Sequence, residues 1–109
     1  MTGLRLDKWL WFARFAKTRS MAAKLCAGGG VTVGGAVVLK PGYFVRIGDA
    51  LVVRQGRVLR RVSVLGLGTR RGPPAEARSL YAEPEPPVAV RALDAAAWVP
   101  LIEDAAEKR

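Results

Sequence analysis

The stretch Arg5–Gly35 reads RLDKWLWFARFAKTRSMAAKLCAGGGVTVGG and contains the features that decide the fold. From Leu6 to Ala13, apolar residues recur at intervals of four and three, which is typical of one face of a helix. A second helical stretch follows the corner Lys17–Ser20 and stops at Gly28–Gly30, because glycine adopts the left-handed conformation at a helix end without steric cost. The stretch therefore predicts two short helices that are joined by a tight corner and followed by a strand.

The chain beyond this stretch alternates short extended segments with turns. Gly34–Gly35 suits a two-residue turn with positive φ at both positions, so it predicts a hairpin. Pro73–Pro74 is expected to open a third helix that runs to about Tyr81, because proline is favoured in a first helical turn. The pattern indicates an α+β fold: two amino-terminal helices packed on a small antiparallel sheet, extended by a β-hairpin, a short third helix and a helical or irregular tail. The expected strands cover residues 31–33, 36–39, 43–47, 50–54 and 57–65.

The chain of 109 residues has the length of one small domain. We expect residues 4–83 to form this domain and residues 84–109 to form a proline-spaced, mildly acidic tail. The segment Glu83–Pro87 is expected to be a stiff extended spacer, since proline-rich sequences favour extended backbone. The alanine-rich segment Val88–Val99 predicts a helix that stops near Pro100.

Positive charge is concentrated in the first two thirds of the chain. Residues 1–72 contain 14 lysines and arginines but only two acids, Asp7 and Asp49, whereas residues 73–109 contain 4 basic and 7 acidic residues. The net charge is therefore +12 in the first part and −3 in the second. A basic body predicts a polyanionic partner. The alternative is a surface charge that serves only solubility.

The composition argues against several functional classes. With no histidine and one cysteine, Cys26, the sequence predicts no metal site of the usual zinc type, no internal disulfide and no cofactor. No apolar run approaches the ~18 residues of a membrane span, and the amino terminus lacks a signal-peptide pattern, so we expect a cytoplasmic protein without a membrane partner. Thr18 and Ser20 have no evident general base, which predicts a protein that is not an enzyme and has no small-molecule substrate.

Basic residues cluster in the helical stretch, and packing of its two helices is expected to gather them into one patch. Such a patch binds phosphates with an affinity that falls steeply as salt is added. The hydroxyl of Thr18 or Ser20 is expected to cap the second helix, whose free amides favour an anion. The clustered residues are Arg5, Lys8, Lys17, Arg19 and Lys24.

Trp9, Trp11 and Phe12 place three large aromatic rings on one short helix. One helix cannot bury all three, so at least one ring is expected to be partly exposed beside the basic residues, where it could stack on unpaired bases. The alternative is that the later strands and the tail cover all three rings.

Several of these segments together resemble a known family. RLDKWL at 5–10, KTRS at 17–20, GGV at 29–31 with its turn at 34–35, and GD at 48–49 resemble the RNA-binding module of small-subunit ribosomal protein four, the alpha-L motif. RQG at 54–56 and RRGPPAEA at 70–77, continuing to LY at 80–81, resemble the ribosome-associated heat-shock protein 15 family.

The resemblance implies a helix–helix–sheet module that binds structured RNA. For the closer family it implies ribosomal RNA of the large subunit, and transfer RNA on stalled subunits, as partners of a stress-related recycling or quality-control factor. The positions that match the RNA-contacting surface are Arg5, Lys8, Arg14, Lys17, Thr18, Arg19, Ser20 and Lys24, together with Lys40.

The sequence departs from this family at two places. The hairpin turn is Gly34–Gly35 where Asn-Gly is usual, and the basic helical end of the family is replaced by a short acidic tail. A negative tail is not expected to lie on RNA, so we expect it to fold back on the basic patch or to meet a protein. Three other functions stay open: an accessory RNA-binding module of an RNA-modifying enzyme, a DNA-binding protein, or a protein-interaction module recruited through Trp98 and the tail.

Overall fold

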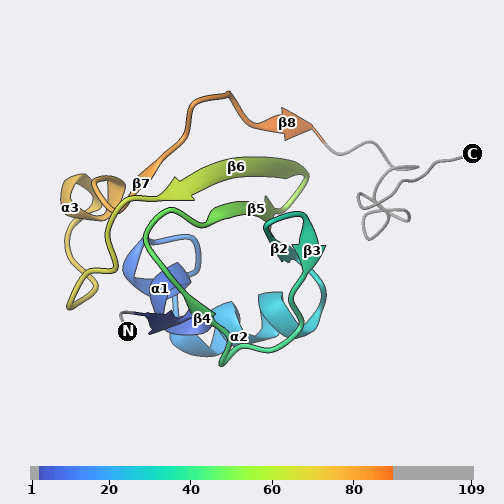
Figure 1. Cartoon of the computed structure of the whole chain (residues 1–109), viewed down its shortest axis with the longest axis horizontal. Helices are drawn as coiled ribbons and strands as arrows, with labels where there is room; N and C mark the ends of the chain where they lie inside the picture. The colour runs from blue at the N-terminus through green and yellow to red at the C-terminus, as the bar shows by residue number, and fades with distance from the viewer. Residues whose placement is uncertain (1–2, 90–109) are drawn as a thin grey trace, which may run out of the picture.

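Two layers make up the fold: helices α1 and α2 lie against one face of an antiparallel sheet (Figure 1). The structure is a computed structural model, and it describes residues 3–89 of the chain. The predicted α+β fold is confirmed. In chain order, the elements are β1 (Leu4–Arg5), α1 (Leu6–Phe12), α2 (Arg19–Ala27), β2 (Val31–Val33), β3 (Ala36–Val37), β4 (Phe44–Val45), β5 (Ala50–Gln55), β6 (Val58–Val64), α3 (Pro74–Arg78), β7 (Tyr81–Ala82) and β8 (Val88–Ala89).

The main sheet has the strand order β3-β2-β5-β6-β7, and β8 pairs with the other end of β6. Gly34 and Gly35 have φ values of +60° and +88°, as the predicted two-residue turn between β2 and β3 requires. β1 and β4 form a separate two-stranded ladder in which Arg5 lies opposite Phe44. This ladder places the loop after β3 at the beginning of α1.

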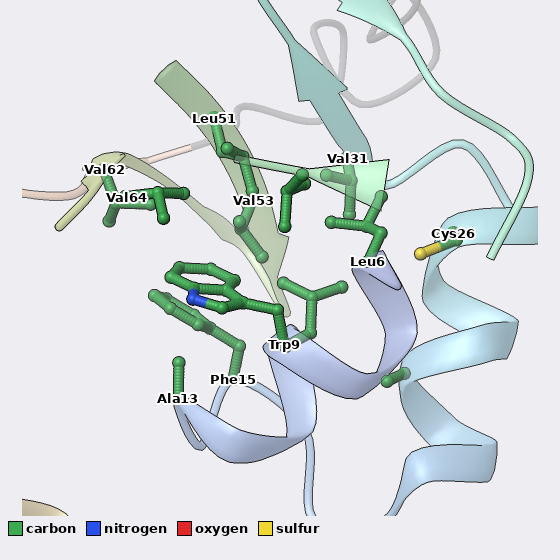
Figure 2. Close-up of a cluster of buried hydrophobic side chains, with 13 residues drawn as sticks. Leu6, Trp9, Ala13, Phe15, Cys26, Val31, Leu51, Val53, Val62 and Val64 are labelled. Atoms are coloured by element: carbon green, nitrogen blue, oxygen red, sulfur yellow. The ribbon is translucent and has the colours of Figure 1, made fainter. Parts of the chain in front are cut away.

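Trp9 is the centre of the core, where its side chain is fully buried between α1 and the sheet. Its ring stacks on Phe15 with the centroids 5.9 Å apart, and Tyr81 approaches with its edge at 6.4 Å. The indole Nε1 donates a hydrogen bond of 2.8 Å to the carbonyl oxygen of Gly66. Figure 2 shows the two stacked rings beneath the side chains of Val62 and Val64 and those of β5. Trp9 therefore connects α1 to the segment that follows β6.

Each end of α2 has a cap that is formed by local hydrogen bonds. The Thr18 hydroxyl oxygen accepts a hydrogen bond of 3.0 Å from the Met21 amide, which identifies Thr18 as the cap. At the other end, Gly29 has a φ of +81°, and the amides of Gly29 and Gly30 donate to the carbonyls of Cys26 and Leu25 at 2.9 Å. A Cβ on Gly30 would meet the end of the Leu25 side chain, so a larger residue here would force that side chain to move.

The strands differ from their predicted bounds by one or two residues at several ends, and three helical boundaries are wrong. The sequence pattern fits a first helix from Arg5, but this helix begins at Leu6, because Arg5 is extended and pairs in β1. The third helix ends at Arg78, because Tyr81 turns toward the core to pack on Phe15, at 4.9 Å between ring centroids, and enters β7. Val88 begins a strand and not a helix, since it pairs with β6, while residues 90–99 of the predicted helix lie outside the described residues.

The acidic segment after Glu83 lies along β6. Glu83 accepts from Arg60 at 2.7 Å and Glu85 accepts from Arg61 at 2.6 Å. The domain boundary expected after Glu83 thus falls within a segment that is paired to the sheet. Within residues 3–89, the acids that follow β7 neutralise arginines of β6 and not those of the helical stretch.

Replacing Trp9 with phenylalanine should lower the free energy of unfolding by about 1–3 kcal/mol. The change leaves a cavity between α1 and the sheet and leaves the Gly66 carbonyl without its donor. Trp11→Phe is the matched control, since Trp11 lies on the same helix but is only half-buried, and we expect a loss below about 1 kcal/mol. Urea denaturation followed by far-UV circular dichroism measures both values, and equal losses would contradict the central position of Trp9.

Candidate nucleic-acid interface

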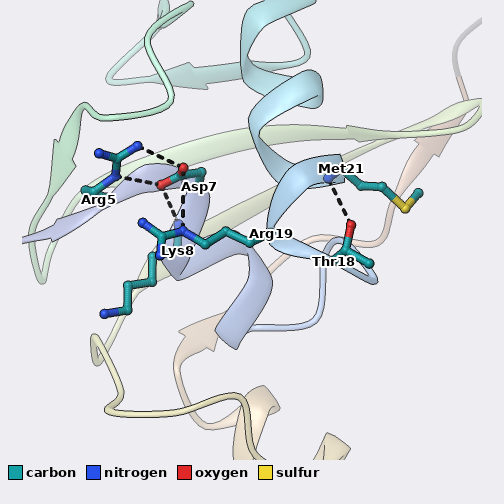
Figure 3. Close-up of polar contacts among 6 residues, drawn as sticks. All are labelled: Arg5, Asp7, Lys8, Thr18, Arg19 and Met21. Atoms are coloured by element: carbon teal, nitrogen blue, oxygen red, sulfur yellow. Dashed lines mark hydrogen bonds and ion pairs between the residues drawn. The ribbon is translucent and has the colours of Figure 1, made fainter.

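Asp7 is a buried carboxylate at the junction of α1 and α2 (Figure 3). Both of its oxygens accept hydrogen bonds from Arg5, each 3.1 Å long, and Oδ1 also accepts from the Lys8 amide at 2.8 Å. The Arg19 Nε, from the first turn of α2, lies 3.7 Å from Asp7 Oδ2. We call these four residues the Asp7 cluster. It joins one arginine from each side of the helical corner through a single acid.

The groups around Asp7 favour the ionised form of its carboxyl group. Burial alone would raise the pKa of Asp7, but the hydrogen bonds and charge of Arg5, the Lys8 amide and the charge of Arg19 together outweigh it. The pKa of Asp7 therefore lies below its ordinary value. The carboxylate is negative at neutral pH and holds both guanidinium groups in place.

The basic side chains of the Asp7 cluster remain open to solvent. The side chains of Arg5 and Arg19 are 47% and 43% exposed, although both face Asp7. The Lys8 Nζ lies over the Phe12 ring, 5.6 Å from its centroid, and the residue is partly exposed. Two guanidinium groups face one carboxylate, so the cluster keeps a net positive charge and can accept a further anion.

The corner before α2 extends this surface. Lys17, Ser20 and Lys24 are exposed, and Ser20 and Lys24 are four residues apart on the same face of α2. In the described part of the chain, no acceptor contacts the amides of Arg19 and Ser20 at the helix start. Free amides at a helix start bind anions readily, and here they lie next to exposed cations.

Among the described residues, the first backbone amides of α1 already have acceptors, in contrast to those of Arg19 and Ser20 in α2. The carbonyls of Tyr43 and Pro41 accept from the amides of Leu6 and Asp7, at 2.7 and 3.0 Å. These carbonyls belong to the turn that starts at the exposed Lys40, and Gly42 in this turn lies against the Arg5 guanidinium. The turn therefore brings Lys40 to the same end of α1 as the Asp7 cluster.

Arg14 is separate from the Asp7 cluster. It follows the last turn of α1, where its Nε donates a hydrogen bond of 2.8 Å to the Gly72 carbonyl. The structure thus brings together the predicted residues of the helical corner and the Lys40 turn, and places Arg14 beside the loop that leads to α3.

The aromatic rings of α1 contribute little to this surface. Trp9 and Phe12 are buried and Trp11 is half-buried, so only Trp11 meets the expectation of partial exposure. The exposed rings beside the basic residues are those of Tyr43 and Phe44, at 39% and 58% exposure. Exposed rings next to cations suit stacking on bases. Sequence reasoning missed them because the pairing of β1 with β4 brings two distant segments together.

Other chemistry is not evident in the described residues. Residues 3–89 contain no group of three acidic, cysteine or histidine side chains that could hold a metal ion. No helix of this region has the length and apolarity that a membrane span needs. Cys26 is buried, as predicted, and burial together with the charge of Asp7 raises the pKa of its thiol to about 12. The thiol is protonated at neutral pH and packs as a small apolar group.

Asp7→Asn should lower the free energy of unfolding at neutral pH by about 1–3 kcal/mol, because two guanidinium groups lose their buried partner. The low pKa of Asp7 means that its stabilising charge is present at neutral pH and is lost as the pH falls through the folded-state pKa. The difference between wild type and variant should therefore shrink in acid. Urea denaturation at neutral and acidic pH measures this difference.

Asp49→Asn serves as the matched control for this substitution. Asp49 accepts from the Arg46 amide at 2.8 Å in an exposed turn, and an amide oxygen can replace that acceptor. A loss of stability as large as that of Asp7→Asn, or a pH-independent difference for Asp7→Asn, would argue against the Asp7 cluster as an ionic junction.

The sequence and structure of the chain are similar to those of known proteins. A family model for the S4 domain matches residues 4–51, which include α1, α2 and the Lys40 turn. Heat shock protein 15 of Escherichia coli strain K12 is 44% identical over 80 residues, covering 73% of this chain. That match covers 59% of the E. coli protein, so the chain spans less than two thirds of its relative.

Two further proteins are similar over a large part of the chain. The RQC P-site tRNA stabilizing factor of Halalkalibacterium halodurans is 43% identical over 61 residues, which are 56% of this chain and 68% of that protein. The trimeric structure of Vibrio cholerae heat shock protein 15 superimposes with a TM-score of 0.71 at 40% identity, and the match covers 75% of this chain and 82% of that chain. With these matches over both the helical corner and the sheet, the chain belongs to the heat shock protein 15 family and carries an S4 domain.

Proposed function

We propose that the chain binds structured RNA through the Asp7 cluster, the corner at the start of α2 and the Lys40 turn. The observation that carries this proposal is one buried carboxylate that holds two exposed guanidinium groups, that of Arg5 from β1 and that of Arg19 from α2. Because the arginines are already ordered, an RNA phosphate can bind them with a smaller loss of side-chain entropy. The match of the S4 domain model to the same residues supports this assignment.

We infer that the RNA is ribosomal RNA of the large subunit and that the protein acts in the cytoplasm. The resemblance to ribosome-associated heat shock protein 15 supports the first partner. A relative that is named as a P-site tRNA stabilizing factor supports transfer RNA on a stalled subunit as a second partner. The resulting role is that of a stress-related recycling or quality-control factor.

We further propose that the protein is not an enzyme and that residues 4–83 form its RNA-binding domain. The relatives are named for a heat shock response and for tRNA stabilisation, and not for a reaction. Each acid near the proposed surface already has a structural partner: Asp7 holds two arginines, and Asp49 caps a turn. The described part of the acidic tail is paired to the sheet, which leaves the helical surface accessible to RNA.

Lys8→Gln and Lys17→Gln should each weaken the binding of large-subunit ribosomal RNA and lower the slope of log affinity against log salt by about one unit. Neither lysine has a carboxylate partner in residues 3–89, so the fold should be unaffected. Arg19 is less suitable for this test because its removal also perturbs Asp7. Filter binding at several salt concentrations measures both the affinity and the slope.

Arg61→Gln is the charge-matched control. Arg61 lies on the face of β6 opposite to that of the buried Val62, and it is paired with the exposed Glu85. We expect its effect on affinity to be clearly smaller than that of either lysine change. Equal effects of all three variants would mean that net charge, and not the helical surface, determines binding.

Co-sedimentation separates the ribosomal role from general nucleic-acid binding. The wild-type chain should migrate with large ribosomal subunits, and the two lysine variants should do so less at equal salt. Displacement of the RNA by an equal amount of duplex DNA, or association only with an RNA-modifying enzyme, would rule out the proposed role.

A further inference from the structure

The two main helices end in the same way but with different residues. At the end of α2, Gly29 has a φ of +81° and its amide and that of Gly30 donate back to the helix. At the end of α1, Arg14 occupies the equivalent position with a φ of +66°, its amide donates to the Trp11 carbonyl at 3.1 Å, and the Phe15 amide donates to Leu10 at 2.9 Å. Glycine adopts this conformation without steric cost, whereas arginine does not.

Arg14 is the one residue other than glycine with a positive φ in the described chain. A strained conformation in a residue with a long charged side chain points to a use for that side chain. The hydrogen bond from its Nε to the Gly72 carbonyl fixes the direction of the guanidinium but engages one of its five N–H donors. The remaining donors belong to its two terminal nitrogens.

Arg14 borders a hollow of about 230 Å³ between the end of α1, α3 and β6. Arg60 and Arg78 line the same hollow, so each of these three elements contributes one arginine. Arg78 is exposed in the last turn of α3, and Tyr81 closes one side. Three guanidinium groups around an open hollow form a site that favours an anion.

The charges at the hollow do not cancel within the described residues. Arg60 is paired with Glu83, through hydrogen bonds of 3.0 and 2.7 Å, which leaves the charges of Arg14 and Arg78 unbalanced. Arg60 also donates to the Tyr81 hydroxyl oxygen at 3.3 Å, so the hydroxyl proton of Tyr81 is available to an acceptor in the hollow.

The end of α1 would ordinarily repel an anion, because helix carbonyls carry partial negative charge there. Here the Arg71 guanidinium donates a hydrogen bond to one of these carbonyls. Its Nε donates to the Trp11 carbonyl at 3.1 Å, and its Nη2 lies 3.4 Å from the Ala16 carbonyl oxygen. The positive charge of Arg71 thus offsets part of the negative charge at this end of the helix.

We propose that this hollow is a second binding point for an RNA backbone phosphate, with Arg14 and Arg78 as its main contacts and the Tyr81 hydroxyl as a third donor. The identity of the ligand rests on the proposed RNA binding. α1 has seven residues and is about 10 Å long, so the hollow lies one short helix away from the Asp7 cluster. One folded RNA can therefore contact both ends of α1.

Binding of a fluorescently labelled RNA hairpin to the full chain tests this site. Arg14→Gly and Arg78→Gln should each weaken binding by about 3–10-fold at moderate salt and lower the salt slope by about one unit, and the double variant should show both losses. Arg61→Gln on the opposite face of the sheet is the charge-matched control and should change the affinity less.

Thermal unfolding of the same variants separates binding from folding. Arg14→Gly should be at least as stable as wild type, since glycine relieves the backbone strain at this position. A lower melting temperature of Arg14→Gly together with unchanged RNA affinity would overturn the proposal, because Arg14 would then serve only its bond to Gly72. Unchanged affinity and salt slope for both single variants would overturn it as well.

The outcomes also distinguish this site from the proposed ribosomal function. If the hollow variants bind the hairpin weakly but the wild-type chain does not co-sediment with large subunits, the phosphate site stands and the ribosomal role fails. If the wild type co-sediments and the hollow variants do so equally well, the phosphate site fails and the ribosomal role stands.

Discussion

The ion-pair junction at Asp7 is the constraint on which the helical surface depends. A buried carboxylate is unfavourable unless it is paired, and here its partners come from two helices and from the strand before the first of them. The Arg19 pair links the first turn of α2 to the first turn of α1. The junction also orders Arg5 and Arg19 before any ligand binds. Fold stability and the display of positive charge thus have a common origin in one side chain.

The elements that follow local rules were predictable from the sequence. The apolar spacing from Leu6 to Ala13 predicted the first helix, and Gly34–Gly35 predicted the hairpin turn. The sequence offered Thr18 or Ser20 as the cap of the second helix, and the structure has Thr18. Each of these features is determined by residues within one or two turns of the chain. The exposed cations of the corner were predictable for the same reason, since a cap and a glycine stop define where the second helix lies.

The features that the sequence did not reveal all depend on pairing between distant segments. Asp7 lies in the first turn of α1, where the carbonyls of Pro41 and Tyr43 already accept from the amides of Asp7 and Leu6. Its carboxylate accepts from the Lys8 amide and also binds Arg5 and Arg19. Likewise, the sequence did not show which of the three aromatic rings of α1 is at the core. Trp9 is, because its Nε1 donates to the Gly66 carbonyl and its ring stacks on Phe15. Helical periodicity carries no information about such partners.

The distribution of counter-charges indicates which arginines support the fold and which require an external anion. Glu83 and Glu85 each neutralise one arginine of β6, and Glu76 pairs with Arg70 at 2.6 Å. At the Asp7 cluster, by contrast, one carboxylate faces two arginines. At the helical corner the exposed cations therefore outnumber the acids, which favours the approach of a polyanion there. The placement of the five acids within residues 3–89, more than the total of basic residues, therefore defines the surface on which a polyanion is expected to bind.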